Sequence, residues 1–199
     1  MKSFVNAILR NFPVTARGRR HLFLALLAAC CLARATDGAL PPIDVQVQVE
    51  GGHVRVQAQV PLPVPREQAW AVMTDYGHMA SFLPNVQEAR VISTHGDQLV
   101  TFQRGTARYG IFSYDFEITR EVILQPQEAV QSRMISGNMK QLDAQATLRD
   151  TAQGLVLDYR SDSVPGYWLP AFVIKPFAEH ETREQFEAMR REMLRRYPQ

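Results

Sequence analysis

Regular alternation of apolar and polar residues on both sides of a glycine pair constrains the fold most. Val45 and Val47 alternate with polar residues before Gly51-Gly52, and Val54 resumes the pattern after it. A period of two places the apolar side chains on one face of a strand. Two adjacent glycines supply the positive φ angles that a tight hairpin needs. The sequence therefore predicts an antiparallel hairpin with one apolar face.

The chain then changes to helical spacing and afterwards returns to strands. Helical spacing begins after Pro65 and predicts one helix to about Asp75 and a second, short one over 77–83. Strand patterns follow up to about residue 162. Because the connections are too short for parallel crossovers, these strands form an antiparallel meander. The predicted turns are Gly96-Asp97, Tyr109-Gly110, Gln125-Pro126, Gly137-Asn138 and Gln153-Gly154.

The last element is a long amphipathic helix, predicted over 178–197. Phe186, Met189 and Met193 share one face with Thr182, and the acidic residues precede the basic ones, as the helix dipole favours. An antiparallel sheet with one apolar face needs a cover, which only this helix supplies. We therefore expect an α+β fold in which the sheet curves around the helix and leaves space for a ligand between them.

The N-terminus has the layout of an export signal. Residues 1–35 hold six Lys and Arg, which leaves 16 such residues against 20 Asp and Glu in the rest. An acidic body argues against a nucleic-acid binder. The basic residues precede a short apolar run, so we expect cleavage after Ala35, or lipoprotein processing at Cys30. The expected product is periplasmic, soluble or lipid-anchored, with a linker over 36–42 and one ligand-binding domain over 43–199.

The sequence offers little catalytic chemistry. Both cysteines lie in the leader, the histidines are dispersed, and no nucleophile elbow or phosphate-binding glycine loop is present. We therefore predict no metal site, no cofactor and no catalytic residue. Asp75 and His78 lie close together, either as an acid–base pair or at a helix corner. Their position between two helices favours the corner, with Asp75 capping the second helix and Tyr76 packing beside it.

One stretch resembles a known family. Residues 64–93, with Trp70, Asp75-Tyr76 and the Phe-Leu-Pro-Asn run at 82–85, are similar to the opening helices of the START / polyketide cyclase (helix-grip, SRPBCC-type) superfamily, which includes coenzyme Q-binding START-type proteins. Residues 109–116 and the last helix add to a similarity that extends from Val45 to Arg196. The resemblance implies a helix-grip fold: a curved antiparallel sheet wrapped around a long C-terminal helix, with two short helices after the first hairpin. It also implies a cavity for a lipid, quinone, isoprenoid or polyketide-like molecule, and it leaves the activity open.

The candidate ligand-binding residues are inward-facing apolar positions on strands and helices, together with one arginine. Alternation places Arg120 among apolar neighbours, where an unpaired charge is costly. Arg120 either anchors a polar ligand head or lies beyond the end of the sheet with its charge in water, and the second arrangement is the more ordinary one. The full set is Trp70, Phe102, Phe112, Tyr114, Phe116, Arg120, Leu142, Ala144, Trp168, Phe186, Met189 and Met193.

Three functions are compatible with these residues. The first is non-catalytic carriage of a hydrophobic small molecule. The second is a cyclase/dehydratase-type enzyme that uses Asp75, Tyr114, Asp115 or Arg120. The third is a protein-interaction module with a collapsed cavity. The stiff apolar loop over 164–172 is either a membrane-touching lip or a connection folded onto the core.

Overall fold

The computed structural model describes residues 40–166 and 170–198. The predicted leader, both of its processing sites and the first part of the linker lie outside the described residues, as does Trp168. Residues 40–199 form one compact unit. Among the described residues, no helix combines the length and the hydropathy needed to cross a bilayer.

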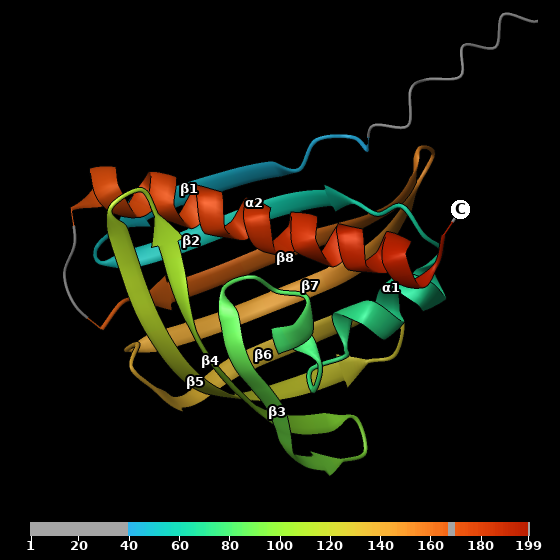
Figure 1. The fold of residues 1–199 in the computed structure, drawn as a ribbon, viewed down its shortest axis with the longest axis horizontal. Coiled ribbons are helices and arrows are strands. Elements are labelled where there is room, and N and C mark those ends of the chain that lie inside the picture. The colour runs from blue at the N-terminus through green and yellow to red at the C-terminus, as the bar shows by residue number, and fades with distance from the viewer. Residues whose placement is uncertain (1–39, 167–169, 199) are drawn as a thin grey trace, which may run out of the picture. The chain divides into compact units, whose positions relative to one another are not determined.

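An eight-stranded sheet forms the body of this unit (Figure 1). Its strands pair in the order β1-β2-β8-β7-β6-β5-β4-β3, and all neighbours are antiparallel. The meander over β3–β8 follows the chain, and the first hairpin joins it where β2 pairs with β8. The strands are β1 (Asp44–Glu50), β2 (His53–Pro61), β3 (Val86–His95), β4 (Gln98–Tyr109), β5 (Phe112–Gln125), β6 (Ala129–Gly137), β7 (Gln141–Thr151) and β8 (Gly154–Val164).

The predicted hairpin is confirmed in position and turn. β1 and β2 are joined by Gly51 and Gly52, whose φ angles of 60° and 85° are those of a left-handed turn. Val45 and Val47 are buried on one face of β1, as the alternation requires. Each of the five other predicted turns also separates two strands.

The helices differ from the prediction in their bounds. α1 (Arg66–Met73) starts directly after Pro65, and the second helix is a single 3₁₀ turn, η1 (Met79–Ser81). α2 (Ala171–Arg196) begins seven residues before the predicted start and continues through Pro176. This proline removes one backbone hydrogen bond, and the packing of a 26-residue helix outweighs that loss.

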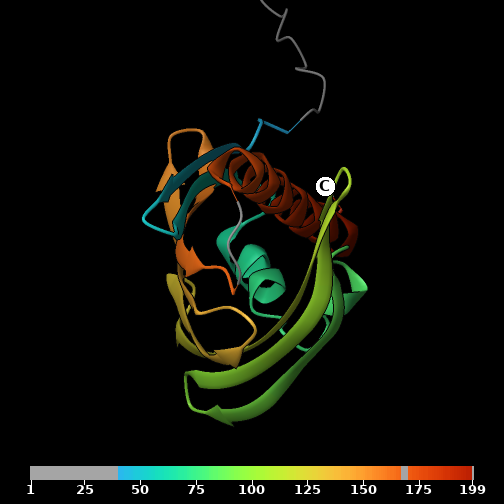
Figure 2. The ribbon, with the colours of Figure 1, turned by 90° about the vertical axis from the view of Figure 1, so that its left-hand side faces the viewer.

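α2 covers the concave face of the sheet. Figure 2 shows the sheet curving from the blue strand β1 round to the green strands β3–β5, with the red helix α2 across the open side. The helix contacts β1, β2, β4 and α1. Phe186, Met189 and Met193 are buried in one cluster with residues of the first hairpin, including Val47 and Val56. The predicted helix-grip arrangement is thereby confirmed.

Candidate ligand-binding cavity

A cavity of about 520 Å³ lies between the inner face of the sheet and α2. Its volume is within the range of roughly 300–1,000 Å³ that small-molecule sites occupy. Strands β3 to β8, α2, the end of α1 and the corner after it supply nearly all of the wall, and β2 adds Val54. The wall is mainly aliphatic and aromatic and includes Met73, Met79, Leu83, Ile118, Val130, Ala146, Leu157, Tyr159, Ile174 and Phe177.

Most of the predicted ligand-binding residues face this cavity. The alternation along β5 is uninterrupted, so one face of that strand supplies four of them. β7 contributes the small Ala144 in mid-strand, which leaves room that a larger side chain would fill. The predicted residues in the wall are Phe112, Tyr114, Phe116, Arg120, Leu142, Ala144, Phe186 and Met189.

Phe102 does not face the cavity, and the prediction that it points inward is wrong. Its neighbours Thr101 and Gln103 are buried, as are Gly105 and Ala107 further along β4, which puts Phe102 on the opposite face. There its ring lies 4.2 Å from the guanidinium carbon of Arg90. The opposite, inward face of β4 includes Gln103, which bonds to Arg120.

Two further predicted residues pack in the core without reaching the cavity wall. Trp70 is partly buried between the two hydrophobic clusters. Met193 is 0% exposed and belongs to the cluster beneath the first hairpin. Both stabilise the shell of the site by burying apolar surface. Trp168 lies outside the described residues, so its placement stays a prediction.

Arg120 forms the centre of a polar end of the cavity. One of its terminal nitrogens donates a hydrogen bond to Gln103 Oε1, and Gln103 Nε2 in turn lies 2.9 Å from Met79 Sδ. Arg120 Nε is buried without a hydrogen-bond partner. The more ordinary arrangement, with the charge in water beyond the sheet, is therefore wrong for this arginine. Arg104, on the outer face, instead pairs with Glu88 at 2.9 Å.

Tyr76 belongs to the same polar end. Its side chain is buried and lines the cavity. Burial raises the pKa of the Tyr76 hydroxyl above its usual value, and the positive charge of Arg120 opposes this shift. The hydroxyl therefore remains protonated near neutral pH and can donate a hydrogen bond into the cavity.

A second polar position lies where α2 passes the β3–β4 pair. Glu181 accepts a hydrogen bond of 2.8 Å from the backbone N–H of Arg108 and one of 3.1 Å from Asn85 Nδ2. Burial raises the pKa of the Glu181 carboxyl, although these two hydrogen bonds favour its ionised form. Asn85 Oδ1 is buried without a partner. Both residues line the cavity, and neither was among the predicted site residues.

Three side chains near this position have the geometry to hold a metal ion. Ligand atoms of His180, Glu181 and Glu184 lie within 4.8 Å of one another. His180 pairs with Glu184 at 3.6 Å, as their spacing predicted. Both carboxylate oxygens of Glu181 already accept hydrogen bonds, so that residue is a poor third ligand for a metal.

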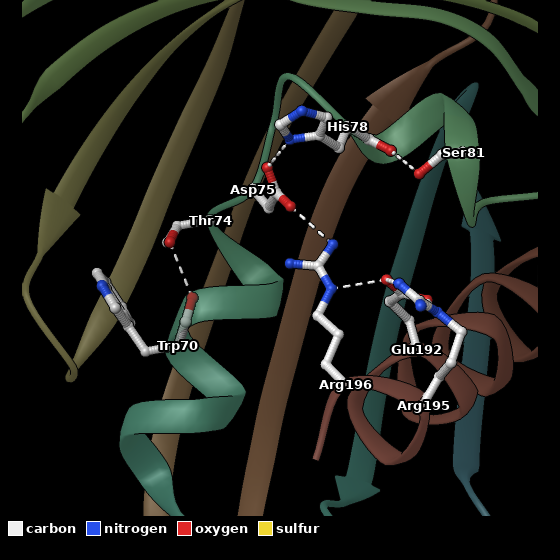
Figure 3. A network of polar contacts seen from close by, with 8 residues as sticks. All are labelled: Trp70, Thr74, Asp75, His78, Ser81, Glu192, Arg195 and Arg196. Carbon is white, nitrogen blue, oxygen red and sulfur yellow. Dashed lines mark hydrogen bonds and ion pairs between the residues drawn. The ribbon is translucent and has the colours of Figure 1, made fainter.

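The corner after α1 contains an ion-pair network in place of the predicted helix cap (Figure 3). Asp75 Oδ1 lies 2.6 Å from His78 Nδ1, and Asp75 Oδ2 lies 2.7 Å from Arg196 on α2. The 3₁₀ turn has no side-chain cap, so the prediction that Asp75 caps it is wrong. The carboxylate binds Arg196 because α2 ends beside this corner. Tyr76 packs at the corner as predicted, and its ring also reaches the cavity.

Comparisons with known proteins agree with this geometry. No curated protein matches the sequence. The STAR-related lipid transfer protein of Xanthomonas axonopodis is 15% identical, with a TM-score of 0.63 over 79% of this chain and 96% of that one. The Zhui aromatase/cyclase of Streptomyces sp. R1128 is 14% identical, with a TM-score of 0.61 over 72% and 95%. A START superfamily protein of Mycobacterium smegmatis is 10% identical, with a TM-score of 0.62 over 71% and 97%.

These identities establish a shared fold and no more. The family model described as polyketide cyclase / dehydrase and lipid transport matches residues 62–190, more than half of the chain. The match includes α1, all strands from β3 to β8 and most of α2, which are the elements that build the cavity wall. The protein therefore belongs to the polyketide cyclase / dehydrase and lipid transport family.

Proposed function

We propose that the protein is a periplasmic, non-catalytic carrier of a hydrophobic small molecule such as a lipid, a quinone, an isoprenoid or a polyketide-like compound. The observation that carries the proposal is the cavity of about 520 Å³ with a largely aliphatic and aromatic wall. Binding would be driven by burial of the ligand's apolar surface against β5 and α2. The family match supports a hydrophobic ligand, and the sequence of the leader supports export.

The positions of the acidic residues support carriage over catalysis. Asp75 is engaged by His78 and Arg196, and Asp115 accepts a hydrogen bond of 2.7 Å from Thr106 at an exposed position of β5. Neither lines the cavity. Of the four catalytic candidates, Tyr114 and Arg120 alone are in its wall. A carrier needs no activated group, whereas a general acid or base must reach the ligand.

We propose further that the protein exchanges its ligand at a membrane surface. Ile111 at the tip of the β4–β5 hairpin is 94% exposed, and Phe172 in the first turn of α2 is 80% exposed. Figure 1 shows this hairpin beside the first half of α2, where the rings of Tyr109 and His180 are 4.9 Å apart. Phe112, next in the hairpin, lines the cavity. Exposed apolar residues beside a cavity entrance suit contact with lipid.

Native mass spectrometry of the protein purified gently from the cells that produce it tests carriage directly. We expect a co-purifying apolar molecule at up to one per chain, released intact by organic solvent. Intact mass in the same experiment separates cleavage after Ala35 from lipidation at Cys30. A protein that carries nothing and takes up no added apolar molecule would contradict the proposal.

An enzyme of the cyclase or dehydratase type is the second candidate. It is favoured by the two titratable wall residues with raised pKa, Tyr76 and Glu181. Prolonged incubation of the co-purified molecule with the protein tests it. Loss of water from that molecule, abolished in Tyr76→Phe or Glu181→Gln, would favour the enzyme, and an unchanged mass favours the carrier. The third possibility required a collapsed cavity and does not fit the observed one.

A further inference from the structure

A single arginine stands at the polar end of the cavity, near the corner after α1. Among the described wall residues, Arg120 is the one cation, and Glu181 is the one carboxylate. No ion pair within 4.0 Å joins Arg120 to any acidic group of the described chain. Partly buried cations are ordinarily paired, because removing an unpaired charge from water is expensive.

The groups around Arg120 orient it without neutralising it. Gln103 accepts a hydrogen bond from one terminal nitrogen, which holds that side of the guanidinium with a neutral group. Arg120 Nε and the hydroxyl of Thr101, the residue directly opposite on β4, are both buried without a partner. A guanidinium held in this way presents donors in a planar fork whose geometry matches an oxyanion.

The strand face between Arg120 and Phe112 is apolar. Along β5 the inward side chains between the two are Ile118, Phe116 and Tyr114, ending at the half-exposed Phe112. Eight residues of strand separate Arg120 from Phe112, or roughly 26 Å at the usual rise per residue. The wall therefore offers one cationic anchor and, along β5, an apolar surface that leads away from it.

We infer that the cavity takes an amphiphile whose oxyanion head, a carboxylate or a phosphate monoester, binds Arg120 while its apolar chain lies along β5 toward Phe112. This inference rests on the proposed carriage of a hydrophobic molecule and names the chemical class of that molecule. The ligand's negative charge would supply the counter-charge that the protein does not. Tyr76, which lines the same cavity and lies within electrostatic range of Arg120, can add a hydrogen bond to the same head.

Equilibrium dialysis of the purified protein with radiolabelled hexadecanoic acid, hexadecyl phosphate and hexadecanol tests this inference. The three share one apolar chain and differ in the head. We expect at least one of the two anions to bind about 10- to 100-fold more tightly than the alcohol, the usual effect of a charge-assisted hydrogen bond in a site with little water. The stronger anion identifies the head.

Two variants assign the effect to one side chain. Arg120→Met keeps a long side chain without the charge, and we expect it to bind the preferred anion only as tightly as the alcohol. Arg104→Met, on the outer face of the sheet, removes a guanidinium from the neighbouring strand and should leave all three affinities unchanged. Circular dichroism shows whether each variant is folded. The wild-type comparison needs no variant and decides the question even if Arg120→Met does not fold.

Equal binding of both anions and the alcohol by the wild-type protein would overturn the inference while leaving carriage intact. Retained preference for the anion in a folded Arg120→Met would overturn the role of this residue. Failure of all three molecules to bind would overturn the inference together with the proposed function.

Discussion

Asp75 and Arg196 join the corner after α1 to the last residue of α2 through a contact of 2.7 Å between Asp75 Oδ2 and Arg196 Nη2 (Figure 3). The two are 121 positions apart in the chain. Arg196 also donates to Glu192 at 2.6 Å, so the same guanidinium bridges the corner and its own helix. The covering helix is therefore held at its C-terminal end by ionic contacts, and α1 cannot move away from α2 without breaking them.

Breaking this bridge should destabilise the fold by a measurable amount. Both side chains are mostly buried, so the pair is screened less than a surface salt bridge. In a double-mutant cycle with Asp75→Ala and Arg196→Ala, we expect a coupling energy of about 1–2 kcal/mol, measured by urea unfolding. The Asp75→Ala, Arg195→Ala cycle is the control, because Arg195 bonds to Glu192 and has no contact with Asp75. Equal coupling in both cycles would contradict a direct contact.

The same network should make stability depend on acidity at low pH. Hydrogen bonds from Arg195 lower the pKa of Glu192, and a further hydrogen bond from Arg196 lowers it more. Burial acts in the opposite direction, and the resulting pKa of Glu192 is about 2. At Asp75 burial opposes ionisation, but hydrogen bonds from His78 and Arg196 outweigh it and leave that pKa lowered as well. Because both folded-state pKa values lie below the ordinary ones, 3.8 for Asp75 and 4.5 for Glu192, the stabilisation is present above those ordinary values and is lost as the pH falls, toward pH 2 for Glu192.

Glu192→Gln isolates this contribution. We expect the free energy of unfolding of the variant to be about 1–2 kcal/mol lower near neutral pH, a figure that allows for the solvent exposure of Arg195. Between pH 4.5 and 2 the stability of the variant should fall less steeply than that of the wild-type protein. Thermal unfolding followed across that window measures both effects. Glu184→Gln, a half-exposed glutamate on the same helix, serves as the matched substitution. Parallel pH profiles for the wild-type protein and Glu192→Gln would rule out the network as the cause.

Local sequence signals were sufficient for the strands and turns because each depends on neighbours in the chain. Period-two alternation predicts the β5 face from Phe112 to Leu124, and the Gly51-Gly52 pair marks the first hairpin. Local signals were not sufficient for the corner after α1. Nothing within a few residues of Asp75 indicates Arg196, so the local capping rule was applied where a long-range ion pair takes the carboxylate.

The inward face of β4 was missed although the sequence contained a usable signal. The apolar character of Phe102 predicts an inward position, whereas its neighbours Thr101 and Gln103 are buried instead. Counting outward from the Tyr109–Phe112 pair at the hairpin turn places Thr101 opposite Arg120. A buried arginine needs polar neighbours, so its cross-strand register indicates that β4 turns its polar face inward. Glu181 and Asn85, in contrast, meet only because α2 lies over β3 and β4, which no local pattern reveals.

Gly105 should tolerate no side chain, although it lies in the middle of β4. A Cβ there would lie 1.9 Å from the carbonyl oxygen of Asn85 and 2.7 Å from Cζ of Phe116. Since that carbonyl accepts the backbone N–H of Thr106, the start of β3 would have to move. We expect Gly105→Ala to lower the free energy of unfolding, measured with urea, by about 2–3 kcal/mol. Gly77 has open space around it, so Gly77→Ala should change this free energy by less than about 0.5 kcal/mol. A Gly105→Ala protein as stable as the wild type would contradict the close approach.

Small residues on β7 set the free space of the cavity, and filling that space should weaken binding without loss of stability. Ala144 and Ala146 line the wall between larger neighbours. In Ala144→Leu the added side chain would occupy ligand volume, so we expect the affinity for hexadecanol to fall about tenfold while the free energy of unfolding changes by less than about 1 kcal/mol. Ala152→Leu, in the exposed turn after β7, adds the same atoms outside the cavity and should bind as the wild type does.

Dialysis and urea unfolding on the three proteins separate the alternatives. If Ala144→Leu is strongly destabilised, the space is a packed core and not a ligand site. If it is stable and binds normally, the ligand lies elsewhere.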